Sequence, residues 1–412
     1  MKIVNIIGKE ILDSCGMPTI GCEIHLENGA VFQSNVPAGK SNNKYQACEL
    51  RDGGKKFFGK GVTKAIDIIN NEIAPQFLGK EPNAIQMDLD MIQMDGTQNK
   101  SKFGANSILA VSMAMYRANA YIAESELYDF IAIVSGSDTV SIPLPIINFA
   151  SGDENVFDQY LLIPYGAQNL KSALDKSIQL FQTFKEILIK KNMITLTSSS
   201  GAFASNYSSI DQPFELLNET MSKLNFNSDL FSIGIDVSAY KFFDPKKETY
   251  NIAGLKKTTE QMVEWYSILF EKYNLYLIED PLALEDLPGW IKLNDALGQN
   301  MHICADELFA TNPERILKGV EYNIANTVVI KPGQIGTVTE TLQSIQVCKE
   351  NGLSTIVSSR SCETCDSFIV DMAVGASSNY INCGGLSRGE RISKYNRLLD
   401  IENTLTNLVL NE

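Results

Sequence analysis

Histidine is almost absent from this chain of 412 residues, which contains only His25 and His302. Histidine is the usual side chain for proton transfer near neutral pH and a frequent zinc ligand. His25 lies on the polar side of the alternating segment CEIHLEN, so it is predicted to face solvent. His302 stands at the start of a predicted strand, away from the end where functional side chains gather. We therefore expect neither histidine to act as a general base.

Long apolar runs and an excess of positive charge are also lacking. No run approaches the roughly 20 apolar residues of a membrane span. The segment MKIVNIIGKEILDS carries charges where a signal peptide needs an apolar centre. Lysine and arginine number 35 against 49 acidic residues, a net charge of −14 that repels nucleic acid and anionic lipid. We expect a cytoplasmic protein with no nucleic-acid partner and no membrane partner.

The eight cysteines are scattered along a chain far larger than a disulfide-stapled module. We therefore expect free thiols. Cys362 and Cys365 form a single CxxC motif, with no second CxxC and no nearby histidine. This pattern predicts no zinc site and leaves a redox pair as the alternative.

Four short apolar runs each end in one charged side chain: SIGID at Asp236, LYLIED at Glu279, HICAD at Asp306 and NTVVIK at Lys331. Each run is typical of a parallel strand followed by a helix. In a closed barrel such strand ends converge at one mouth. Three carboxylates there suit Mg²⁺, and a lysine beside a metal-bound substrate can give up its proton more easily. The alternative is four separately solvated charges in loops.

Residues 1–135 are predicted to form an α+β domain. Alternating segments at 2–11, 19–27 and 30–35 predict a small antiparallel sheet. The long segment VPAGKSNNKYQACELRDGG then suggests either a functional lid or a solvated connection. Helices are predicted at 62–73, 83–93 and 106–134, the last of them a core helix that breaks near Ser125.

Residues 144–412 are predicted to form an eight-stranded (β/α) barrel, because strand and helix patterns alternate from about residue 145 onwards. The segment SGSDTVSIPLP marks the boundary before it. The predicted strands are 159–163, 193–197, 231–235, 275–278, 302–304, 327–330, 354–357 and 380–381, and the predicted helices include 170–190, 259–273, 337–351 and 388–403.

Several segments together resemble the enolase family: VPAGKS, ELRDGG, DGTQNKSKFGANSILAVS, IGIDVSA, LIEDPL, ADELFATNP, IKPGQIGT, VSSRSCET and SRGERISKYNRLL. The resemblance covers essentially the whole chain. Enolases are phosphopyruvate hydratases, carbon–oxygen lyases of glycolysis that interconvert 2-phosphoglycerate and phosphoenolpyruvate. The resemblance implies an N-terminal α+β cap domain, an enolase-type modified eight-stranded barrel, two Mg²⁺ ions and a homodimer.

The resemblance also implies roles for individual residues on the metal and phosphate side of the site. A guanidinium suits phosphate, and a lysine near a metal suits removal of a proton next to a carboxylate. The matching positions are Asp236, Glu279 and Asp306 for the metal, Ser41 on a lid for a second metal, Lys331 as the base, and Arg360 and Ser361 for the substrate phosphate.

On the opposite side, residues that the family uses are replaced. Ser200 in SSSGAFAS stands where the family's GDEGGFAP loop supplies a glutamate. Gln159 replaces another glutamate, Ser359 a histidine and Asn382 a lysine. The family's histidine loop is shortened to SGDENV, without a histidine. A serine is too weak an acid to help hydroxide leave at neutral pH.

We therefore expect an enolase homologue that binds Mg²⁺ and a small phosphorylated or phosphonate hydroxy-acid anion, with dehydration of 2-phosphoglycerate impaired or altered. The alternative is a functional phosphopyruvate hydratase in which Asp153, Glu154 or Asp158 compensates. A third reading, a structural protein without a ligand, conflicts with retention of the metal, base and phosphate positions.

The resemblance also bears on assembly. Gly21 stands where the family has a glutamate of its dimer contact, and Cys15 where it has an arginine. The sequence ends in NLVLNE, without the basic tail that contributes to the family's dimer interface. We expect any homodimer to have a weakened interface.

Overall fold

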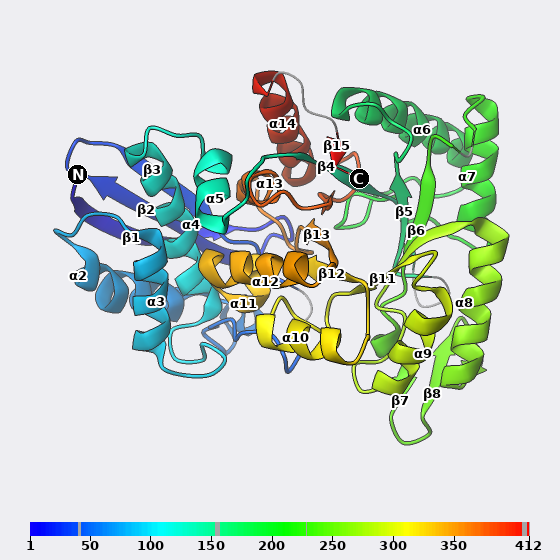
Figure 1. Cartoon of the computed structure of the whole chain (residues 1–412), viewed down its shortest axis with the longest axis horizontal. Coiled ribbons are helices and arrows are strands. Elements are labelled where there is room, and N and C mark those ends of the chain that lie inside the picture. The colour runs from blue at the N-terminus through cyan, green and yellow to red at the C-terminus, as the bar shows by residue number, and fades with distance from the viewer. Residues whose placement is uncertain (40–42, 153–156, 228, 406–409, 412) are drawn as a thin grey trace.

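The computed structural model describes residues 1–39, 43–152, 157–227, 229–405 and 410–411. The N-terminal part, coloured blue to cyan in Figure 1, lies beside a closed barrel that is surrounded by helices. The predicted α/β fold is confirmed. Within the described residues, no helix combines the length and the apolar character that a membrane crossing requires.

The N-terminal sheet is antiparallel and has the order β1 (Ile3–Leu12), β2 (Pro18–Leu26), β3 (Val31–Asn35), as predicted. Helix α4 (Ala105–Ile122) packs against this sheet and is buried along most of its length. It ends before α5 (Leu127–Ser135), so the predicted break near Ser125 is confirmed. The other helices of this part are α1 (Thr63–Ile68), which continues through the π-helical turn η2 (Ile69–Ile73) into α2 (Ala74–Phe77), and α3 (Ala84–Asp95).

Eight strands close the barrel, because the last strand pairs with the first. Most neighbours are parallel, but the second strand runs antiparallel to both of its neighbours. The strands are β4 (Ile142–Ser151), β5 (Gln159–Ile163), β6 (Ser232–Asp236), β10 (Leu275–Glu279), β11 (His302–Ala305), β12 (Thr327–Ile330), β13 (Ser354–Ser358) and β14 (Tyr380–Asn382).

One predicted barrel strand was wrong. Residues 193–197 form no strand, because Ile194 and Leu196 are exposed and only Thr197 makes an isolated bridge. The strand that the prediction missed is β4, which begins inside the proline-containing segment interpreted as a boundary. All ten of its residues are buried, so packing on both faces outweighs the local signal of the prolines.

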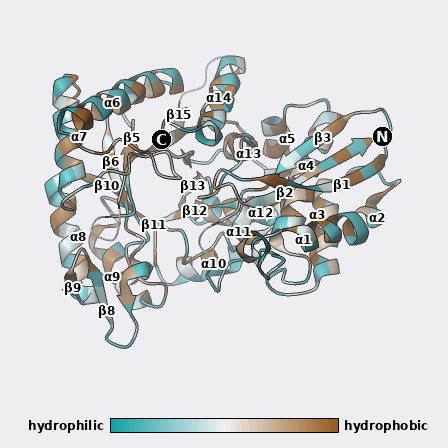
Figure 2. Ribbon diagram, turned by 180° about the vertical axis from the view of Figure 1, so that it is seen from behind, coloured by the Kyte–Doolittle hydropathy of each residue, from teal (hydrophilic) through white to brown (hydrophobic). Residues whose placement is uncertain are grey.

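Helices surround the barrel, and Figure 2 shows alternating hydrophobic and hydrophilic stretches along α6, α7 and α8. This alternation places one apolar face of each helix against the barrel. The helices are α6 (Leu170–Lys190), α7 (Gln212–Lys223), α8 (Thr259–Tyr273), α9 (Leu287–Leu297), α10 (Pro313–Glu321), α11 (Pro332–Ile335), α12 (Val338–Glu350), α13 (Phe368–Gly375) and α14 (Gly389–Thr404).

Short elements complete the fold. A three-stranded hairpin sheet projects from the barrel beside α8 and α9 (Figure 1). These elements are β7 (Phe243–Asp244), β8 (Thr249–Ile252), β9 (Leu255–Lys257), β15 (Leu410–Asn411), and the 3-10 turns η1 (Lys56–Gly59) and η3 (Ala239–Phe242).

The expectation of free thiols was wrong for two cysteines. Cys15 and Cys362 form a disulfide across 347 residues of sequence. The fold brings the turn between β1 and β2 against the segment after β13, which no cysteine spacing could show. Cys365 is exposed and free, so the CxxC motif is not the disulfide pair of this structure. The other free cysteines are Cys22, Cys48, Cys304, Cys348 and Cys383.

His302 lies where the sequence predicts, whereas His25, which was predicted to face solvent, is only partly exposed. His302 hydrogen-bonds Thr327 Oγ1 at 2.7 Å and the Tyr380 hydroxyl at 3.1 Å. All three residues begin their strands, so His302 lies at the end of the barrel opposite to the charged strand ends. Burial lowers its pKa. His25 is half-buried beside Glu23 in the N-terminal sheet.

A buried carboxylate joins the N-terminal part to the barrel. Asp88 on α3 accepts hydrogen bonds from Ser112 Oγ on α4 at 2.9 Å and from Thr339 Oγ1 on α12 at 2.7 Å. All of these bonds reach Oδ2, and Oδ1 has no hydrogen-bond partner among the described residues. Burial raises the pKa of Asp88 to about 6. Above that pH Asp88 is ionised in the folded protein, and its burial then lowers the free energy of unfolding.

We predict that Asp88→Asn stabilises the protein more at pH 7 than at pH 4, compared with the unmodified protein at the same pH. The amide keeps an acceptor for Ser112 and Thr339 but carries no charge. Because the folded-state pKa is raised, the Asp88 contribution to stability is present at low pH and is lost as pH rises through about 6. The advantage of the variant in thermal unfolding should therefore grow between pH 4 and pH 7, by on the order of 1–3 kcal/mol.

The matched control is Asp90→Asn, which removes a half-exposed carboxylate from the same helix. It should show no such dependence. An Asp88→Asn variant whose advantage is constant or shrinks over this range would contradict the assignment of a buried, charged Asp88.

Candidate active site

A cavity of about 900 Å³ opens at the C-terminal ends of the barrel strands. The strands bring together there every predicted site residue that the structure describes; Ser41 lies outside the described residues, as do residues 40 and 42 of the predicted lid. The predicted residues that line the cavity are Gln159, Ser200, Asp236, Glu279, Asp306, Lys331, Ser359, Arg360, Ser361 and Asn382.

Three carboxylates and a lysine lie on one side of this cavity. Asp236 ends β6, Glu279 ends β10, and Asp306 directly follows β11. Lys331 follows β12, and its Nζ donates a hydrogen bond to Asp306 Oδ2. Since β6, β10, β11 and β12 are successive parallel neighbours, their ends meet at the same edge. The convergence predicted from the four apolar runs is therefore present.

Two further buried acids stand behind these carboxylates, and the sequence analysis missed both. Asp280 accepts hydrogen bonds from the backbone N–H groups of Asp306, at 3.0 Å, and Glu307, at 3.3 Å. Glu307 accepts a hydrogen bond from Gln46 Nε2 at 2.7 Å. The doublets Glu279–Asp280 and Asp306–Glu307 were the available signal. Asp280 fixes the backbone on which Asp306 sits, while Glu307 ties this edge to the N-terminal part.

The crowding of buried acids perturbs their protonation. Burial, followed by the nearby Asp158 carboxylate, raises the pKa of Asp236 to about 7. Burial and then Asp236 raise the pKa of Glu279 well above its usual value. For Lys331 burial alone would lower the pKa, but the carboxylates of Asp306 and Glu279 outweigh burial and raise it. In this arrangement of carboxylates the raised pKa keeps Lys331 protonated. The predicted easier loss of its proton concerns a lysine beside a metal-bound substrate and stays a prediction.

The donor set fits a hard divalent cation. Carboxylate oxygens are the ligands that Mg²⁺ prefers, and a cation would relieve the repulsion that raises these carboxyl pKa values. Their oxygens are not preassembled into a tight cluster. Among the described residues, the only set of three metal-ligating side chains whose ligand atoms all lie within 4.8 Å is Asp13, Cys15 and Cys362.

Arg360 supplies a buried positive charge to the cavity. Its side chain is 6% exposed. Nη2 donates to Gln46 Oε1 at 3.3 Å, whereas Nη1 is buried with no hydrogen-bond partner among the described residues. The backbone at Gly39 passes so close that a Cβ there would lie 1.6 Å from Nη2. A guanidinium with unused donors beside the exposed Ser361 suits an oxyanion such as phosphate.

Arg391, which the sequence analysis did not single out, holds the loops around Arg360 in place. It is 2% exposed and donates to Ser359 Oγ at 2.6 Å. It also donates to the backbone carbonyls of Ser199 at 2.8 Å, Arg360 at 2.9 Å and Ser361 at 3.0 Å. The motif SRGERI carried this residue, but its role depends on contacts between three separate segments. Ser359 thus serves as an acceptor for Arg391.

The opposite side of the cavity is an uncharged hydrogen-bond network. Ser200 Oγ donates to Gln159 Oε1 at 2.8 Å, and Asn148 Nδ2 donates to the same oxygen at 3.0 Å. Gln159 Nε2 donates to Ser151 Oγ at 3.2 Å, while the hydroxyls of Ser198 and Ser200 lie 2.8 Å apart. The two substituted positions, 159 and 200, are therefore direct neighbours and satisfy each other.

Asn382 lies at the end of β14 and contributes no charge. Its Oδ1 accepts a hydrogen bond from the Gly384 N–H at 2.9 Å, which shapes the turn after the strand. The neutral side of the site thus extends from Gln159 to Asn382.

One candidate for a compensating acid lies in the cavity. Asp158 Oδ1 forms an ion pair with Lys241 Nζ at 3.0 Å, and both side chains are about 40% exposed. Burial would lower the Lys241 pKa, but the Asp158 and Asp236 carboxylates outweigh it and raise the pKa. Lys241 was not predicted as a site residue. The other two candidates, Asp153 and Glu154, lie outside the described residues.

Comparison with known proteins agrees with this geometry. Residues 3–131 match the family model described as the enolase N-terminal domain, and residues 139–410 match that of the enolase C-terminal TIM barrel domain. An enolase from Ehrlichia canis (strain Jake) is 40% identical over 413 residues, which span 98% of this chain and 97% of that relative. Both domains and nearly the full length are therefore matched, which supports an enolase-type function. The chain belongs to the enolase family.

Proposed function

We propose that this protein binds Mg²⁺ and a small phosphorylated hydroxy-acid anion at the barrel mouth but dehydrates 2-phosphoglycerate poorly. The observation that carries this proposal is the uncharged network of Gln159, Ser200 and Asn148, which occupies the side of the cavity opposite to Lys331. One half of the cavity is built for charge, and the other half is neutral.

The charged half supports cation and anion binding together. Asp236, Glu279 and Asp306 would hold Mg²⁺, which when bound neutralises negative charge that develops on a substrate carboxylate. Arg360 would bind the phosphate through Nη1, which has no hydrogen-bond partner among the described residues, with Ser361 beside it. Ser41, outside the described residues, remains the proposed contact to a second ion.

Lys331 is the proposed base for the proton next to the substrate carboxylate. Its ammonium is held by Asp306, so it must be released and lose a proton before it can act. A ligand that draws Asp306 away would weaken that ion pair and reduce the carboxylate charge facing Lys331. The carboxylate charge that raises the Lys331 pKa in the structure would then be smaller, so the Lys331 pKa would fall.

The neutral half explains the expected loss of dehydration. Departure of hydroxide requires a proton donor, and general acid catalysis contributes about 10²- to 10⁴-fold. Ser200 and Gln159 hydrogen-bond one another and carry no acidic proton near neutral pH. Asn382 supplies no positive charge for the substrate carboxylate. The site therefore assists removal of the proton but gives little assistance to departure of the hydroxide.

The second candidate function is a working phosphopyruvate hydratase that uses Asp158. Its presence in the cavity favours this alternative. Its ion pair with Lys241 opposes it, because Oδ1 of this carboxylate is already engaged by the ammonium. Lys241 itself would have to donate a proton from a group whose pKa is raised.

We predict that turnover of 2-phosphoglycerate with Mg²⁺ is at least about 100-fold below the roughly 10 s⁻¹ of a median enzyme. We also predict that Ser200→Glu combined with Gln159→Glu raises this turnover tenfold or more. The 2.8 Å bond between the two side chains places the introduced carboxyls together. Adjacent carboxyls share a proton, so one stays protonated near neutral pH and can act as an acid. Absorbance of the enol product measures the rate.

Ser198→Glu is the matched control, because it adds a carboxyl to the same network at a position where no family acid is replaced. It should bring no gain. Turnover by the unmodified protein within about tenfold of an ordinary enzyme, together with its loss in Asp158→Asn, would establish the alternative function instead.

We also predict that Mg²⁺ with 2-phosphoglycerate raises the thermal unfolding midpoint by a few degrees beyond Mg²⁺ alone, and that Arg360→Met abolishes this increment. A ligand that binds only the folded state stabilises it according to its concentration relative to Kd. The increment due to Mg²⁺ alone should survive, since Arg360 contacts none of the three carboxylates in the structure.

Lys44→Met is the control, because it removes the same charge from an exposed residue near the mouth whose ammonium pairs with Glu285 on the surface. It should retain the increment. Equal losses in both variants would indicate general electrostatics rather than a bound phosphate, and no increment in the unmodified protein would contradict anion binding.

A further inference from the structure

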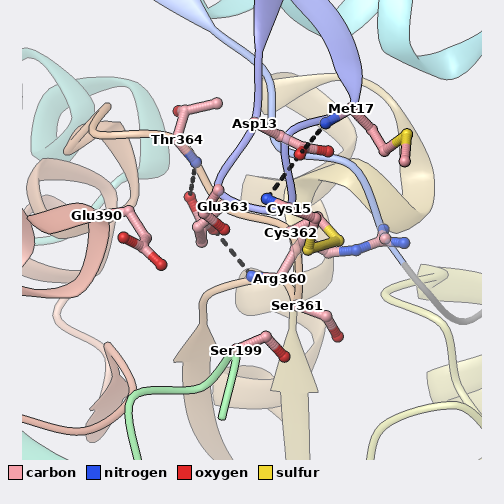
Figure 3. The surroundings of a disulfide bond; sticks show 12 residues. Asp13, Cys15, Met17, Ser199, Arg360, Ser361, Cys362, Glu363, Thr364 and Glu390 are labelled. Carbon is pink, nitrogen blue, oxygen red and sulfur yellow. Dashed lines mark hydrogen bonds between the residues drawn. A yellow bond between two sulfur atoms is a disulfide. The ribbon is translucent and has the colours of Figure 1, made fainter. Parts of the chain in front are cut away.

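The disulfide lies beside the proposed phosphate site. Cys15 belongs to the turn between β1 and β2, and Cys362 follows Arg360 and Ser361 after β13, with a Cα–Cα distance of 5.5 Å. Figure 3 shows the two sulfur atoms next to Arg360, with Ser361 adjacent in the chain. The bond therefore connects the N-terminal part directly to the segment that supplies the cavity with its buried guanidinium.

Hydrogen bonds on both sides make this disulfide a junction of three segments. The Ser14 N–H donates to the Glu363 carbonyl at 2.8 Å. Ala38 and Cys362 exchange two backbone bonds, of 2.9 and 3.1 Å, near the start of the predicted lid segment. Any movement of Cys362 is therefore transmitted to the backbone beside Gly39, which packs against Arg360.

Side chains fix the geometry on each side of the bond. Asp13 Oδ1 accepts hydrogen bonds from the N–H groups of Cys15, at 2.8 Å, and Met17, at 3.0 Å (Figure 3). Glu363 accepts one from the Arg360 N–H at 2.9 Å and pairs with the buried Lys394 at 3.0 Å. Both ends of the disulfide thus stand on ordered turns, and the covalent bond is the strongest link between them.

We propose that the Cys15–Cys362 pair is a redox-modification site that controls anion binding: the disulfide holds Arg360 and Ser361 in their binding arrangement, and its reduction weakens that binding. The effect on anion affinity rests on the proposed function. The effect on the Arg360 segment does not, and it is measured separately below.

The redox step is an exchange with a dithiol reductant. Cys15 is partly exposed, whereas Cys362 is buried, so the reductant thiolate attacks Cys15 Sγ. A mixed disulfide forms at Cys15 and the Cys362 thiolate leaves. The second thiol of the reductant then attacks the mixed disulfide and releases Cys15. The two protons of the dithiol end on the two cysteines, and the reductant leaves as its own disulfide, so two electrons pass to the protein.

Reduction leaves the junction dependent on hydrogen bonds between the turn and the loop. Ser14 still bonds Glu363, but no covalent bond then limits the distance between Cys15 and Cys362. The segment gains freedom that a bound anion must remove again, which lowers the affinity. Couplings between sites typically change affinity by 5- to 150-fold, so we expect the Kd to rise by about fivefold or more on reduction.

The experiment equilibrates the full-length protein in dithiothreitol buffers of defined oxidised-to-reduced ratio and traps thiols by alkylation. Mass spectrometry gives the fraction with a Cys15–Cys362 bond. Calorimetry with Mg²⁺ and 2-phosphoglycerate gives the Kd, and hydrogen exchange gives the protection of residues 359–363. A zinc-selective chelator is present, because the reduced thiols and the unpartnered Oδ2 of Asp13 lie close enough to capture a soft cation.

Matched variants separate the pair from the other thiols. Cys15→Ser combined with Cys362→Ser should match the reduced protein and no longer respond to the buffer. Cys365→Ser removes an exposed free thiol three residues away and should respond like the unmodified protein. Affinity and protection that follow the oxidised fraction in the unmodified protein and in Cys365→Ser, but not in the double variant, would support the proposal.

Three results would overturn it: no Cys15–Cys362 bond at any buffer ratio, equal Kd values in both states, or equal protection of residues 359–363 in both states. Should neither state bind the anion at all, the proposed function fails. The redox site is then judged by protection alone, which must still fall on reduction.

Discussion

The mouth of the barrel is organised by the repulsion between buried carboxylates that the strand ends force together. Asp236, Glu279 and Asp306 converge because their strands are parallel neighbours, and Lys331 is the cation that partly offsets them. Supporting groups depend on the same charges. Asp280 binds the backbone of the loop that follows β11, and Gln46 and Asn43 from the N-terminal part bond Glu307. The site therefore couples the two parts of the molecule through Glu307, which lies next to Asp306 in the chain.

The two halves of the cavity differ in kind. The charged half contains groups with unused capacity, such as Nη1 of Arg360 and the carboxyls with raised pKa values. The neutral half is largely satisfied internally, through bonds among Gln159, Ser200 and their neighbours. We propose that a site with this asymmetry binds an anion and a cation and serves proton removal, but offers little help to a departing hydroxide. Because the chain belongs to the enolase family, the reaction against which this asymmetry is judged is that of enolases.

The sequence predicted those features that depend on local pattern. The strand ends at Asp236, Glu279, Asp306 and Lys331 were evident from apolar runs, and the residues in the cavity followed from the resemblance. Features that depend on contacts between distant segments were missed. Strand β4 looks like a proline-rich boundary until its burial is known, and residues 193–197 look like a strand until their exposure is known.

The same reason accounts for the remaining differences. The Cys15–Cys362 bond and the contacts of Arg391 each join segments far apart in the chain. The raised pKa of Lys331 likewise depends on how many carboxylates face it in the folded protein. Lone charges in a sequence do not reveal that balance.

The most direct test incubates 2-phosphoglycerate with the protein and Mg²⁺ in deuterated water. Proton NMR then follows the substrate over time. Loss of the C2 proton signal reports proton removal, and new vinyl signals report dehydration. We predict exchange at C2 that clearly outpaces phosphoenolpyruvate formation and that disappears in Lys331→Ala. Vinyl signals that appear as fast as the C2 proton is lost, or no exchange despite bound ligand, would contradict it.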